Sequence, residues 1–465
     1  MTLPAAGWRR DLVLALFVAV VAAAFRLPRL GFPAEEVFDE VYHAKTAQQY
    51  LDGQWPTEWV HPPTAKLLIA TGVWAFGYES WAWRLAPVLA GIALAPLFFL
   101  LARQVLPSER AALLASTLLL ADGVYLVQSR IAMTNIFAVL FQIGAALFIV
   151  RAARREQLPW VEMGVAGIFL GLALSTRWTS LWATAFLGCT LLAYRRTRIF
   201  RPREILLTAM AFVVLPLALY VLSYLPFMLQ QHKDIEFVVK WQREIYRYHK
   251  NLNATHPYFS AWWTWPWLYR PTWYYFTSLK GWTNGIIAIG NPALWWASVP
   301  VSLVALWQGL RPRDVRLGLF GLATILLGIA SFVGGGAGEA FGFLFALAGL
   351  ALVIASRPTI RDTVALFAGA GFFALYLPWA ISPRTLNYSH YLFEAIPYAC
   401  LSLGLLLDRH WDGRSRPVAI GYVVLVVLLF LLFFPMLTAL AVPQDLFNRT
   451  LVGSVRLWTW FPSWI

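Results

Sequence analysis

Two adjacent carboxylates, Asp39 and Glu40, are the clearest candidates for acid–base chemistry in this chain. His61 and Lys66 follow at short range, so one segment gathers acids, an imidazole and an amine. A carboxylate within hydrogen-bonding distance of a hydroxyl acts as a general base. The alternative is structural, because Asp is a common helix N-cap and Glu is common in a first helical turn. The pair alone fits both interpretations, and the crowding of ionisable groups favours catalysis.

Three arginines, Arg130, Arg177 and Arg384, are candidates for binding an anion. Each lies next to a long apolar run, so each is expected at a membrane boundary. The fork-shaped guanidinium suits the oxyanions of a phosphate, whose negative charge grows when it departs as a leaving group. The alternative for any one of them is an arginine that extends to lipid headgroups.

The histidines and tryptophans leave further alternatives open. His61 and His390 lie in different segments without a tight cluster of ligands, so we expect no metal. The Trp-rich stretch 262–273, which includes Trp263, fits a platform for a sugar or peptide. The alternative, an aromatic belt at the membrane interface, fits the stretch slightly better.

The composition requires lipid as part of the solvent. Of 465 residues, 60% are hydrophobic and only 13% are charged, and the mean hydropathy is +0.62. A soluble domain is nearer one-half apolar and one-quarter charged. The net charge of +14 does not indicate a nucleic-acid partner, because the arginines lie in short loops between apolar runs.

About thirteen runs are apolar enough to predict membrane-spanning helices. They cover residues 11–25, 83–104, 111–128, 134–150, 163–176, 179–194, 205–227, 293–309, 317–334, 338–355, 362–381, 391–407 and 417–440. Two long segments, 26–82 and 229–291, fall between spans on one side of the membrane. The first contains an apolar stretch, residues 67–76, that is too short to cross and predicts an interfacial or re-entrant helix.

Arginine clusters predict the orientation of these spans. With this set, every cluster falls on the same side, which predicts a cytoplasmic N-terminus and an external segment 26–82. The clusters lie within residues 9–10, 103–110, 151–155, 195–203, 311–316, 357–361 and 409–416.

Short motifs follow one another along the chain in a specific order. They are Phe38-Asp39-Glu40, His61-Pro62-Pro63 with Lys66, Gln128-Ser129-Arg130-Ile131, Ser175-Thr176-Arg177-Trp178, His256-Pro257-Tyr258, residues 262–266, Ser382-Pro383-Arg384, His390-Tyr391 and residues 456–465. In order and spacing they resemble the protein O-mannosyltransferase family, over nearly the whole chain. No segment matches the β-trefoil domain of eukaryotic members, so the resemblance is to the bacterial type.

This resemblance implies a fold and an activity. The fold is an all-α polytopic membrane protein of the GT-C glycosyltransferase type, with about 11–13 transmembrane helices in a single domain, residues 1–465. The implied activity transfers mannose, with inversion, from polyprenyl-phosphate-mannose to Ser/Thr hydroxyls of secreted or translocating proteins. Segment 26–82 would be the catalytic loop and segment 229–291 a Trp-rich external loop. Residues 317–356 would be a helical hairpin additional to the usual eleven spans.

The resemblance also implies roles, partners and a location. Asp39 would be the general base and Glu40 would position the acceptor. The phosphate ligands would be Arg130, Arg177 and Arg384, and the other substrate-binding residues His61, Lys66, His390, Tyr391 and Trp263. No metal and no cofactor is expected. The expected partners are the lipid-linked donor, the acceptor protein, membrane lipid and the secretion machinery. The expected location is the plasma (inner) membrane, with the active site on the extracytoplasmic face.

Two positions depart from the family pattern, and two other functions compete. Asn135 and Trp59 stand where the family often has an acid, so a second acidic function at those points is in doubt. A related enzyme that moves another sugar, or that uses a lipid or glycan acceptor, would share this architecture. A transporter or flippase is a more distant alternative, because the acids lie outside the spans and the two halves of the chain show no similarity.

Overall fold

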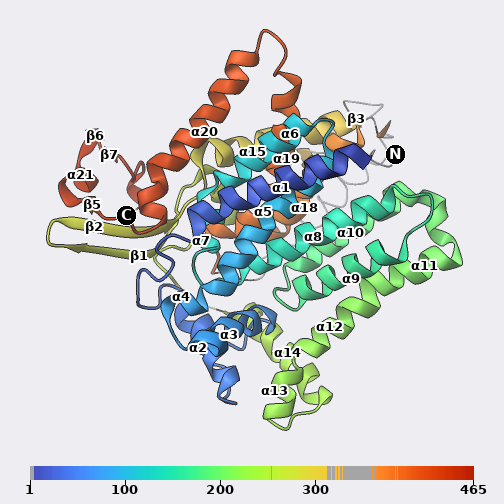
Figure 1. Ribbon diagram of the computed structural model, residues 1–465, viewed down its shortest axis with the longest axis horizontal. Helices are drawn as coiled ribbons and strands as arrows, with labels where there is room; N and C mark the ends of the chain where they lie inside the picture. Colours follow the sequence, from blue (N-terminus) through green and yellow to red (C-terminus); the bar gives the residue numbers. More distant parts are fainter. Residues whose placement is uncertain are drawn as a thin grey trace.

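The chain folds into a bundle of helices with a small β-sheet at one end (Figure 1). The computed structural model describes residues 5–252, 254–311, 359–360, 362–382, 384 and 386–464, and isolated positions between 316 and 327. The hairpin expected at residues 317–356 lies almost wholly outside the described residues.

Five helical segments in the described part are long and apolar enough to cross a membrane. They are Ser80–Val105, Asn135–Ala153, Pro202–Gln230, Thr363–Ile381 and Arg416–Thr438. These segments contain α4 (Ser80–Trp83), α5 (Leu85–Val105), α8 (Asn135–Ala153), α11 (Pro202–Ala209), α12 (Leu215–Ser223), α13 (Leu225–Gln230), α18 (Thr363–Tyr376) and α20 (Arg416–Leu437). The expected polytopic helical architecture is therefore confirmed, and the total of 11–13 spans stays a prediction.

The other expected spans in the described part also fall on helices. These are α1 (Ala5–Arg26), α9 (Trp160–Leu174), α10 (Ser180–Arg195), α15 (Pro292–Gly309) and α19 (Ile396–Arg409). Helix α8 is buried along almost its whole length and packs against α5, α9 and α10. Arg177 separates α9 from α10, where the sequence predicts an interruption.

The span expected at residues 111–128 is broken. It forms α6 (Glu109–Leu120) and α7 (Gly123–Gln128), with Asp122 at the break. The Asp122 carboxylate accepts a hydrogen bond from the backbone N–H of Tyr125 at 2.8 Å and one from Trp295 Nε1 at 2.7 Å. An acid that caps a new helix start favours such a break over a continuous helix.

Loops that carry arginine clusters meet at one end of the bundle. Ion pairs join Arg10–Glu109, Arg103–Asp11, Arg110–Asp408 and Arg409–Asp362, with N–O distances of 2.6, 2.8, 2.6 and 2.7 Å. These contacts connect loops that the charge pattern assigns to one side. Which side of the membrane this end faces stays a prediction.

The segment 26–82, which the sequence predicts to be external, folds into short helices. Helix α2 (Glu40–Leu51) begins at the paired acids, and α3 (Thr64–Phe76) begins after the His-Pro-Pro motif. Helix α3 has 13 residues, too few to cross a bilayer at 1.5 Å per residue. The short apolar stretch therefore forms the helix that the sequence predicts.

The segment 229–291, the second of the two long segments, contains strands that the all-helical prediction missed. Strands β1 (Thr272–Leu279) and β2 (Trp282–Ala288) form an antiparallel hairpin, and β5 (Val442–Pro443) adds a third strand. At the turn, Lys280 and Gly281 both have positive φ, at 52° and 80°. Such a two-residue turn and a run rich in Thr and aromatic residues both favour a hairpin.

An amphipathic helix, α14 (Ile235–Asn251), starts this second segment. Its apolar residues Val238, Trp241 and Ile245 recur every three or four positions and pack against Tyr224 and Phe227 of the preceding helices. The remaining elements are 3-10 helices η1 (Arg196–Phe200), η3 (Trp262–Trp267), η4 (Leu377–Ile381), η5 (Ser389–Glu394) and η6 (Pro462–Trp464), π-helix η2 (Met210–Val214), strands β3 (Leu310–Arg311), β4 (Thr359–Ile360), β6 (Thr450–Val452) and β7 (Val455–Arg456), and α21 (Gln444–Asn448).

Candidate active site

Asp39 occupies the N-cap position of α2 without using its carboxylate as a cap. Its side chain makes no capping hydrogen bond. Its backbone carbonyl accepts hydrogen bonds from the N–H groups of Tyr42 and His43, at 3.0 and 2.9 Å. The carboxylate is therefore available for other chemistry, and the geometry does not support the structural interpretation of this residue.

Phe38 holds Asp39 in place from an unusual backbone conformation. Its φ is 51°, in the left-handed region that side chains other than glycine seldom adopt. Its ring stacks on Tyr274 of β1, with centroids 4.1 Å apart. The rings of His256, Tyr388 and His390 surround it edge-on, at 6.3, 5.8 and 6.1 Å. Three segments distant in sequence thus fix the residue that precedes Asp39.

The surroundings of Asp39 favour a base of raised affinity for protons. Burial raises the pKa of its carboxyl group above the ordinary value, although electrostatic interactions with His43 and Arg384 lower it. A general base works best when its pKa approaches the working pH. The site therefore shifts the pKa of the Asp39 carboxyl group in the direction that favours a general base.

Glu40 is fully buried and its carboxylate is occupied. Arg84 donates from Nε to Oε1 at 2.8 Å and from Nη2 to Oε2 at 2.7 Å. Backbone N–H groups of Val37 and Ala132 donate to the same two oxygens, at 3.0 and 2.8 Å. The two adjacent acids thus have different surroundings, because the Glu40 carboxylate accepts four hydrogen bonds and the Asp39 carboxylate makes no capping bond. The contacts of Glu40 tie α2 to α5 and to the loop before α8.

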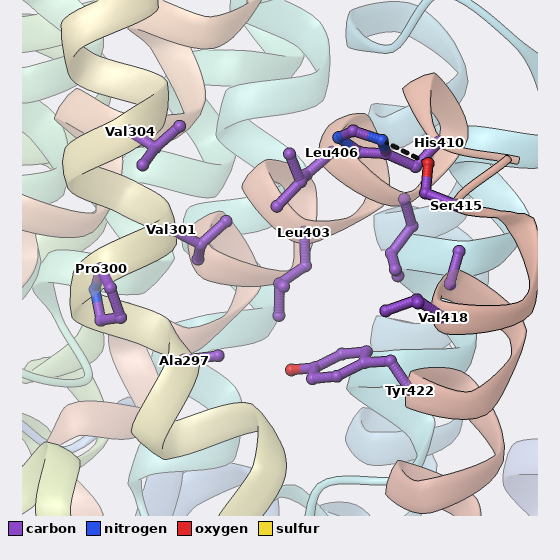
Figure 2. A pocket seen from close by; sticks show the side chains of 12 residues that line it. Ala297, Pro300, Val301, Val304, Leu403, Leu406, His410, Ser415, Val418 and Tyr422 are labelled. Atoms are coloured by element: carbon purple, nitrogen blue, oxygen red, sulfur yellow. Dashed lines mark hydrogen bonds between the residues drawn. The ribbon is translucent and has the colours of Figure 1, made fainter. Parts of the chain in front are cut away.

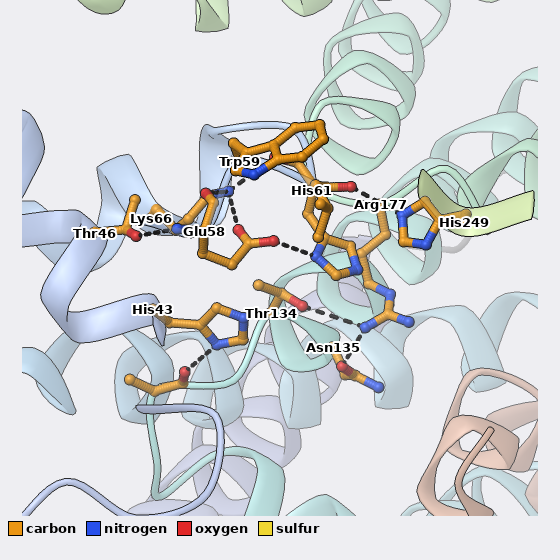
Figure 3. A network of polar contacts seen from close by, with 12 residues as sticks. His43, Thr46, Glu58, Trp59, His61, Lys66, Thr134, Asn135, Arg177 and His249 are labelled. Atoms are coloured by element: carbon orange, nitrogen blue, oxygen red, sulfur yellow. Dashed lines mark hydrogen bonds and ion pairs between the residues drawn. The ribbon is translucent and has the colours of Figure 1, made fainter. Parts of the chain in front are cut away.

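His61 and Lys66 meet at a third acid, Glu58 (Figure 3). The fully buried Lys66 ammonium donates to the Glu58 carboxylate, and to the backbone oxygens of Glu58 and His61 at 3.0 and 2.8 Å. His61 Nδ1 lies 2.7 Å from Glu58 Oε1. Burial alone would raise the pKa of Glu58, but Lys66 and His61 hold it well below its usual range.

A pocket of about 590 Å³ lies beside this network and is lined by three cationic side chains and two histidines. His61, Arg177, His249, Lys250 and Arg384 line it. Its apolar wall consists of Val60, Pro62, Trp178, Leu181, Trp182, Ala185, Pro378, Trp379 and Ile381, with Thr179, Tyr246 and Ser382 completing the lining. A charged end and a long apolar wall suit an amphiphile that carries an anionic group.

Arg177 and Arg384 converge on one aromatic ring. Their guanidinium carbons lie 5.2 and 5.8 Å from the ring centroid of Tyr391, which stacks on Trp379 at 4.8 Å. Arg384 Nε donates to the backbone oxygen of Leu386 at 2.8 Å. The structure thus brings two of the three predicted phosphate ligands together, each within about 6 Å of the Tyr391 ring.

The contacts of Arg177 leave one nitrogen of its guanidinium in an ion pair with Glu394 but without a hydrogen bond. Its Nη1 donates to Asn135 Oδ1 at 2.6 Å, and its Nε lies 3.7 Å from a Glu394 carboxylate oxygen, too far for a hydrogen bond. That Nε is buried and has no hydrogen-bond partner in the described part of the chain. Asn135, which stands where the family often has an acid, therefore accepts from Arg177 without neutralising it.

Arg130 lies apart from this pocket. Its Nη1 donates to the backbone carbonyls of Arg26 and Phe25, at 2.5 and 3.4 Å, at the end of α1. Burial and the nearby arginines lower the pKa of Arg130 to about 10. Cationic side chains favour the carbonyl end of a helix. These contacts anchor α1 to the loop before α8.

Two other predicted residues have contrasting positions. His390 is buried, and its ring stacks on Tyr388 with centroids 5.4 Å apart. Both rings belong to the aromatic clamp, the group of His256, Tyr274, Tyr388 and His390 around Phe38. Trp263 is 51% exposed and does not line the pocket. The structure thus places His390 at the site and Trp263 away from it.

Sequence reasoning missed Glu58, Arg84, His249 and Glu394. Arg84 is the second residue of the expected span 83–104, and an ionised side chain in a span is itself a functional signal. Glu58 precedes His61 by three residues, a spacing that permits an ion pair. His249 and Glu394 have no such local signal, because their partners are distant in sequence. The described residues include no group of three or more His, Cys, Asp or Glu side chains placed to bind a metal, and the absence of a metal stays a prediction.

A second pocket, of about 460 Å³, lacks the groups for this chemistry (Figure 2). Its walls come from α15, α19 and α20 and are almost wholly apolar. The polar side chains there are His410, Ser415 and Tyr422, and His410 Nδ1 contacts Ser415 Oγ at 2.9 Å. Among the described residues, no arginine or lysine lines it, so it lacks the cations that a lipid phosphate would need.

Comparison with known sequences identifies the family. The profile of dolichyl-phosphate-mannose-protein mannosyltransferases matches residues 16–80 and 78–230, and that of the C-terminal four-TMM region of protein-O-mannosyltransferase matches residues 235–311. The polyprenol-phosphate-mannose–protein mannosyltransferase of Mycolicibacterium smegmatis is 26% identical over 99% of this chain and 93% of that protein. Its namesake from Mycobacterium tuberculosis is 25% identical over 96% of this chain and 90% of that protein.

Solved structures agree on the fold. The S. cerevisiae protein O-mannosyltransferase Pmt1–Pmt2 complex bound to the sugar donor aligns with a TM-score of 0.70 at 14% identity, over 93% of this chain and 90% of that chain. ArnT from Cupriavidus metallidurans in the apo state aligns with a TM-score of 0.50, also at 14% identity, over 94% of this chain and 77% of that chain. These similarities confirm the expected GT-C glycosyltransferase fold. Together with the profile matches, they show that this chain belongs to the protein O-mannosyltransferase family.

Proposed function

We propose that this membrane protein transfers mannose from polyprenyl-phosphate-mannose to Ser/Thr hydroxyls of secreted or translocating proteins. The observation that carries the proposal is a free, half-buried carboxylate, Asp39, under the electrostatic influence of two arginines that line a largely apolar pocket. The pocket suits a lipid phosphate, and the carboxylate suits activation of a hydroxyl.

In the proposed reaction, Asp39 takes the proton from the acceptor hydroxyl. The acceptor oxygen forms a bond to the anomeric carbon of mannose, on the face opposite the phosphate. The bond between that carbon and the phosphate oxygen breaks, and polyprenyl phosphate leaves with the electron pair. The anomeric configuration is inverted. The transition state resembles an oxocarbenium ion, as in other glycosyl transfers.

Arg177 and Arg384 would neutralise the leaving phosphate, and the apolar wall would hold the start of the polyprenyl chain. The exposed Lys250 ammonium at the same pocket is a further candidate for the phosphate. Arg130 receives less support, because backbone carbonyls of α1 accept its hydrogen bonds. Permanent cations at the phosphate make a resident metal or cofactor unnecessary to this scheme.

Glu40 would act through structure. Its carboxylate oxygens accept four hydrogen bonds in all, two from Arg84 and two from the backbone. We therefore assign Glu40 to holding the start of α2, which sets the position of Asp39 and of the acceptor hydroxyl. Direct contact between Glu40 and the acceptor would require these bonds to open.

The proposed location is the plasma membrane, with the N-terminus in the cytoplasm and the pocket on the extracytoplasmic face. The arginine-rich loops would then lie on the cytoplasmic side, where such loops are enriched. An extracytoplasmic site would meet acceptor proteins as they leave the secretion machinery. That machinery is the proposed macromolecular partner of this enzyme.

A transfer assay tests this function directly. Purified enzyme is incubated with polyprenyl-phosphate-mannose and a Thr-rich peptide, and the anomeric configuration of the product is read by NMR. We expect a mannosylated peptide of inverted configuration. Retention of configuration would contradict the single-displacement scheme. Transfer to lipid or glycan but not to peptide would instead support the related enzyme with another acceptor.

A further inference from the structure

The hydrogen-bond network determines which nitrogen of His61 carries a hydrogen. Glu58 is paired with Lys66, so its carboxylate is ionised and can only accept. His61 Nδ1, at 2.7 Å from Glu58 Oε1, must therefore donate. In a neutral imidazole the other nitrogen is then an acceptor. His61 Nε2 makes no hydrogen bond to any described residue, although the ring lines the pocket.

His249 on α14 shows the same arrangement with the nitrogens exchanged. Its Nε2 lies 2.9 Å from the backbone oxygen of Val60, a group that can only accept, so Nε2 carries the hydrogen. Its Nδ1 is buried and lacks a hydrogen-bond partner within the described chain. The rings of His61 and His249 lie 5.5 Å apart, and both line the same pocket.

The surroundings keep both imidazoles neutral. Burial lowers the pKa of His61 to about 3, against the opposing influence of Glu58. Burial also lowers the pKa of His249, and Arg177 contributes to the lowering at both rings. Figure 3 shows the two rings close to the Arg177 side chain. The pocket therefore has three cationic side chains, Arg177, Arg384 and Lys250, and two imidazole nitrogens that can only accept.

Such nitrogens select the part of a ligand that they contact. A phosphodiester has only acceptor oxygens, which the guanidinium groups suit and the unprotonated nitrogens do not. The nitrogens require a hydrogen-bond donor that is uncharged, because a cation would be repelled by the arginines. Sugar hydroxyls meet both requirements, and in the proposed donor they lie next to the phosphate.

We propose that His61 Nε2 and His249 Nδ1 form the subsite for the sugar hydroxyls of the donor, each accepting a hydrogen bond from one hydroxyl. This inference rests on the proposed function, since it assigns the sugar half of the donor to this pocket. Glu58 and Lys66 are then positioning residues that fix the His61 tautomer. The two histidines are specificity residues that select a sugar with hydroxyls at the correct positions.

The test compares mannosyl donors that each lack one hydroxyl. Wild-type enzyme, His61→Ala and His249→Ala are assayed for kcat/KM with polyprenyl-phosphate-mannose and its monodeoxy analogues. A buried acceptor left without its donor costs about 10- to 100-fold, so the wild type should discriminate against one analogue for each histidine by that factor. Each variant should lose the discrimination against its own analogue. His410→Ala, in the apolar pocket, is the matched control and should discriminate like the wild type.

Binding of sugar-free polyprenyl phosphate separates this inference from the proposed function. Its Kd, measured by calorimetry, should stay within about threefold of wild type in both histidine variants. An equal loss of affinity for the sugar-free lipid and for the mannosyl donor would overturn the inference, as would deoxy discrimination that survives both substitutions. A wild-type enzyme that binds the mannosyl donor but transfers nothing to peptide would contradict the proposed function. The comparison of Kd for the mannosyl donor with Kd for the sugar-free lipid would still test the inference in that case.

Discussion

At the scale of residues, two adjacent acids differ because of their distant partners. The sequence alone predicts that Asp39 and Glu40 perform different tasks, since consecutive side chains point in different directions. The sequence does not reveal which of the two carboxylates is hydrogen-bonded within the protein, because Arg84, the partner of Glu40, lies 44 residues away. Glu58 is a different case, because it precedes His61 by only three residues and its spacing could have indicated the ion pair.

Substitution of Glu40 tests its structural role. Glu40→Ala leaves Arg84 buried without a counter-charge, and such a loss costs roughly 3–5 kcal/mol. We expect a lower midpoint of thermal unfolding in detergent. Glu79→Ala, which removes an exposed acid that makes no capping bond, is the matched control. An unchanged midpoint combined with a raised acceptor KM would instead support direct acceptor positioning by Glu40.

The phosphate ligands can be ranked by alanine substitution. Arg177→Ala and Arg384→Ala should each weaken binding of polyprenyl phosphate by about 10- to 100-fold, because a charge-assisted hydrogen bond is lost. Lys at either position should restore part of the affinity, since it keeps the charge without the fork. The Kd of Arg130→Ala should change by less than about threefold. Unchanged affinity in both pocket variants would mean that these arginines contact headgroups instead.

At the scale of elements, the sequence predicted helices well and the strands poorly. Long apolar runs identify helices because the bilayer requires about 20 apolar residues in succession. Polar and apolar residues show no clear alternation over the stretch 272–288, and its aromatic residues fit an interfacial loop as well as a strand. The hairpin matters to the site, because β1 supplies Tyr274, on which Phe38 stacks.

The aromatic clamp on Phe38 should control the protonation of Asp39. In the wild type, burial raises the pKa of this carboxyl group, and activity is lost as pH falls through that pKa. Phe38→Ala removes the ring that shields Asp39, so kcat should fall and the acidic limb of the kcat/KM profile should move to lower pH. Phe276→Ala, on an exposed part of the same hairpin, should leave the profile unchanged. An acidic limb that stays in place would show that Phe38 does not shield the carboxylate.

At the scale of the whole molecule, charge sorts the two ends of the bundle. Arginine-rich loops meet through ion pairs at one end. The grouping was predictable because the positive-inside rule acts on the sequence of each loop separately. The contacts between loops were not predictable, because they depend on packing among helices distant in sequence.

Labelling in intact cells tests the orientation. In a Cys189→Ser background, Asp52→Cys places an exposed thiol at the end of α2, and an impermeant maleimide should label it before lysis. Arg414→Cys, in the loop before α20, is the matched control and should react only after lysis. The reverse pattern would place the pocket on the cytoplasmic side.

The most direct test of the central claim is the turnover of Asp39→Asn. Asn keeps the shape and the hydrogen bonding of Asp and is as good an N-cap, but it cannot take a proton. Losing a general base typically costs about two to four orders of magnitude in rate. We predict that kcat for peptide mannosylation falls by that factor, while the Kd for polyprenyl phosphate and the thermal midpoint stay at wild-type values. An Asp39→Asn enzyme with near-normal kcat would contradict the account and remove Asp39 from the mechanism.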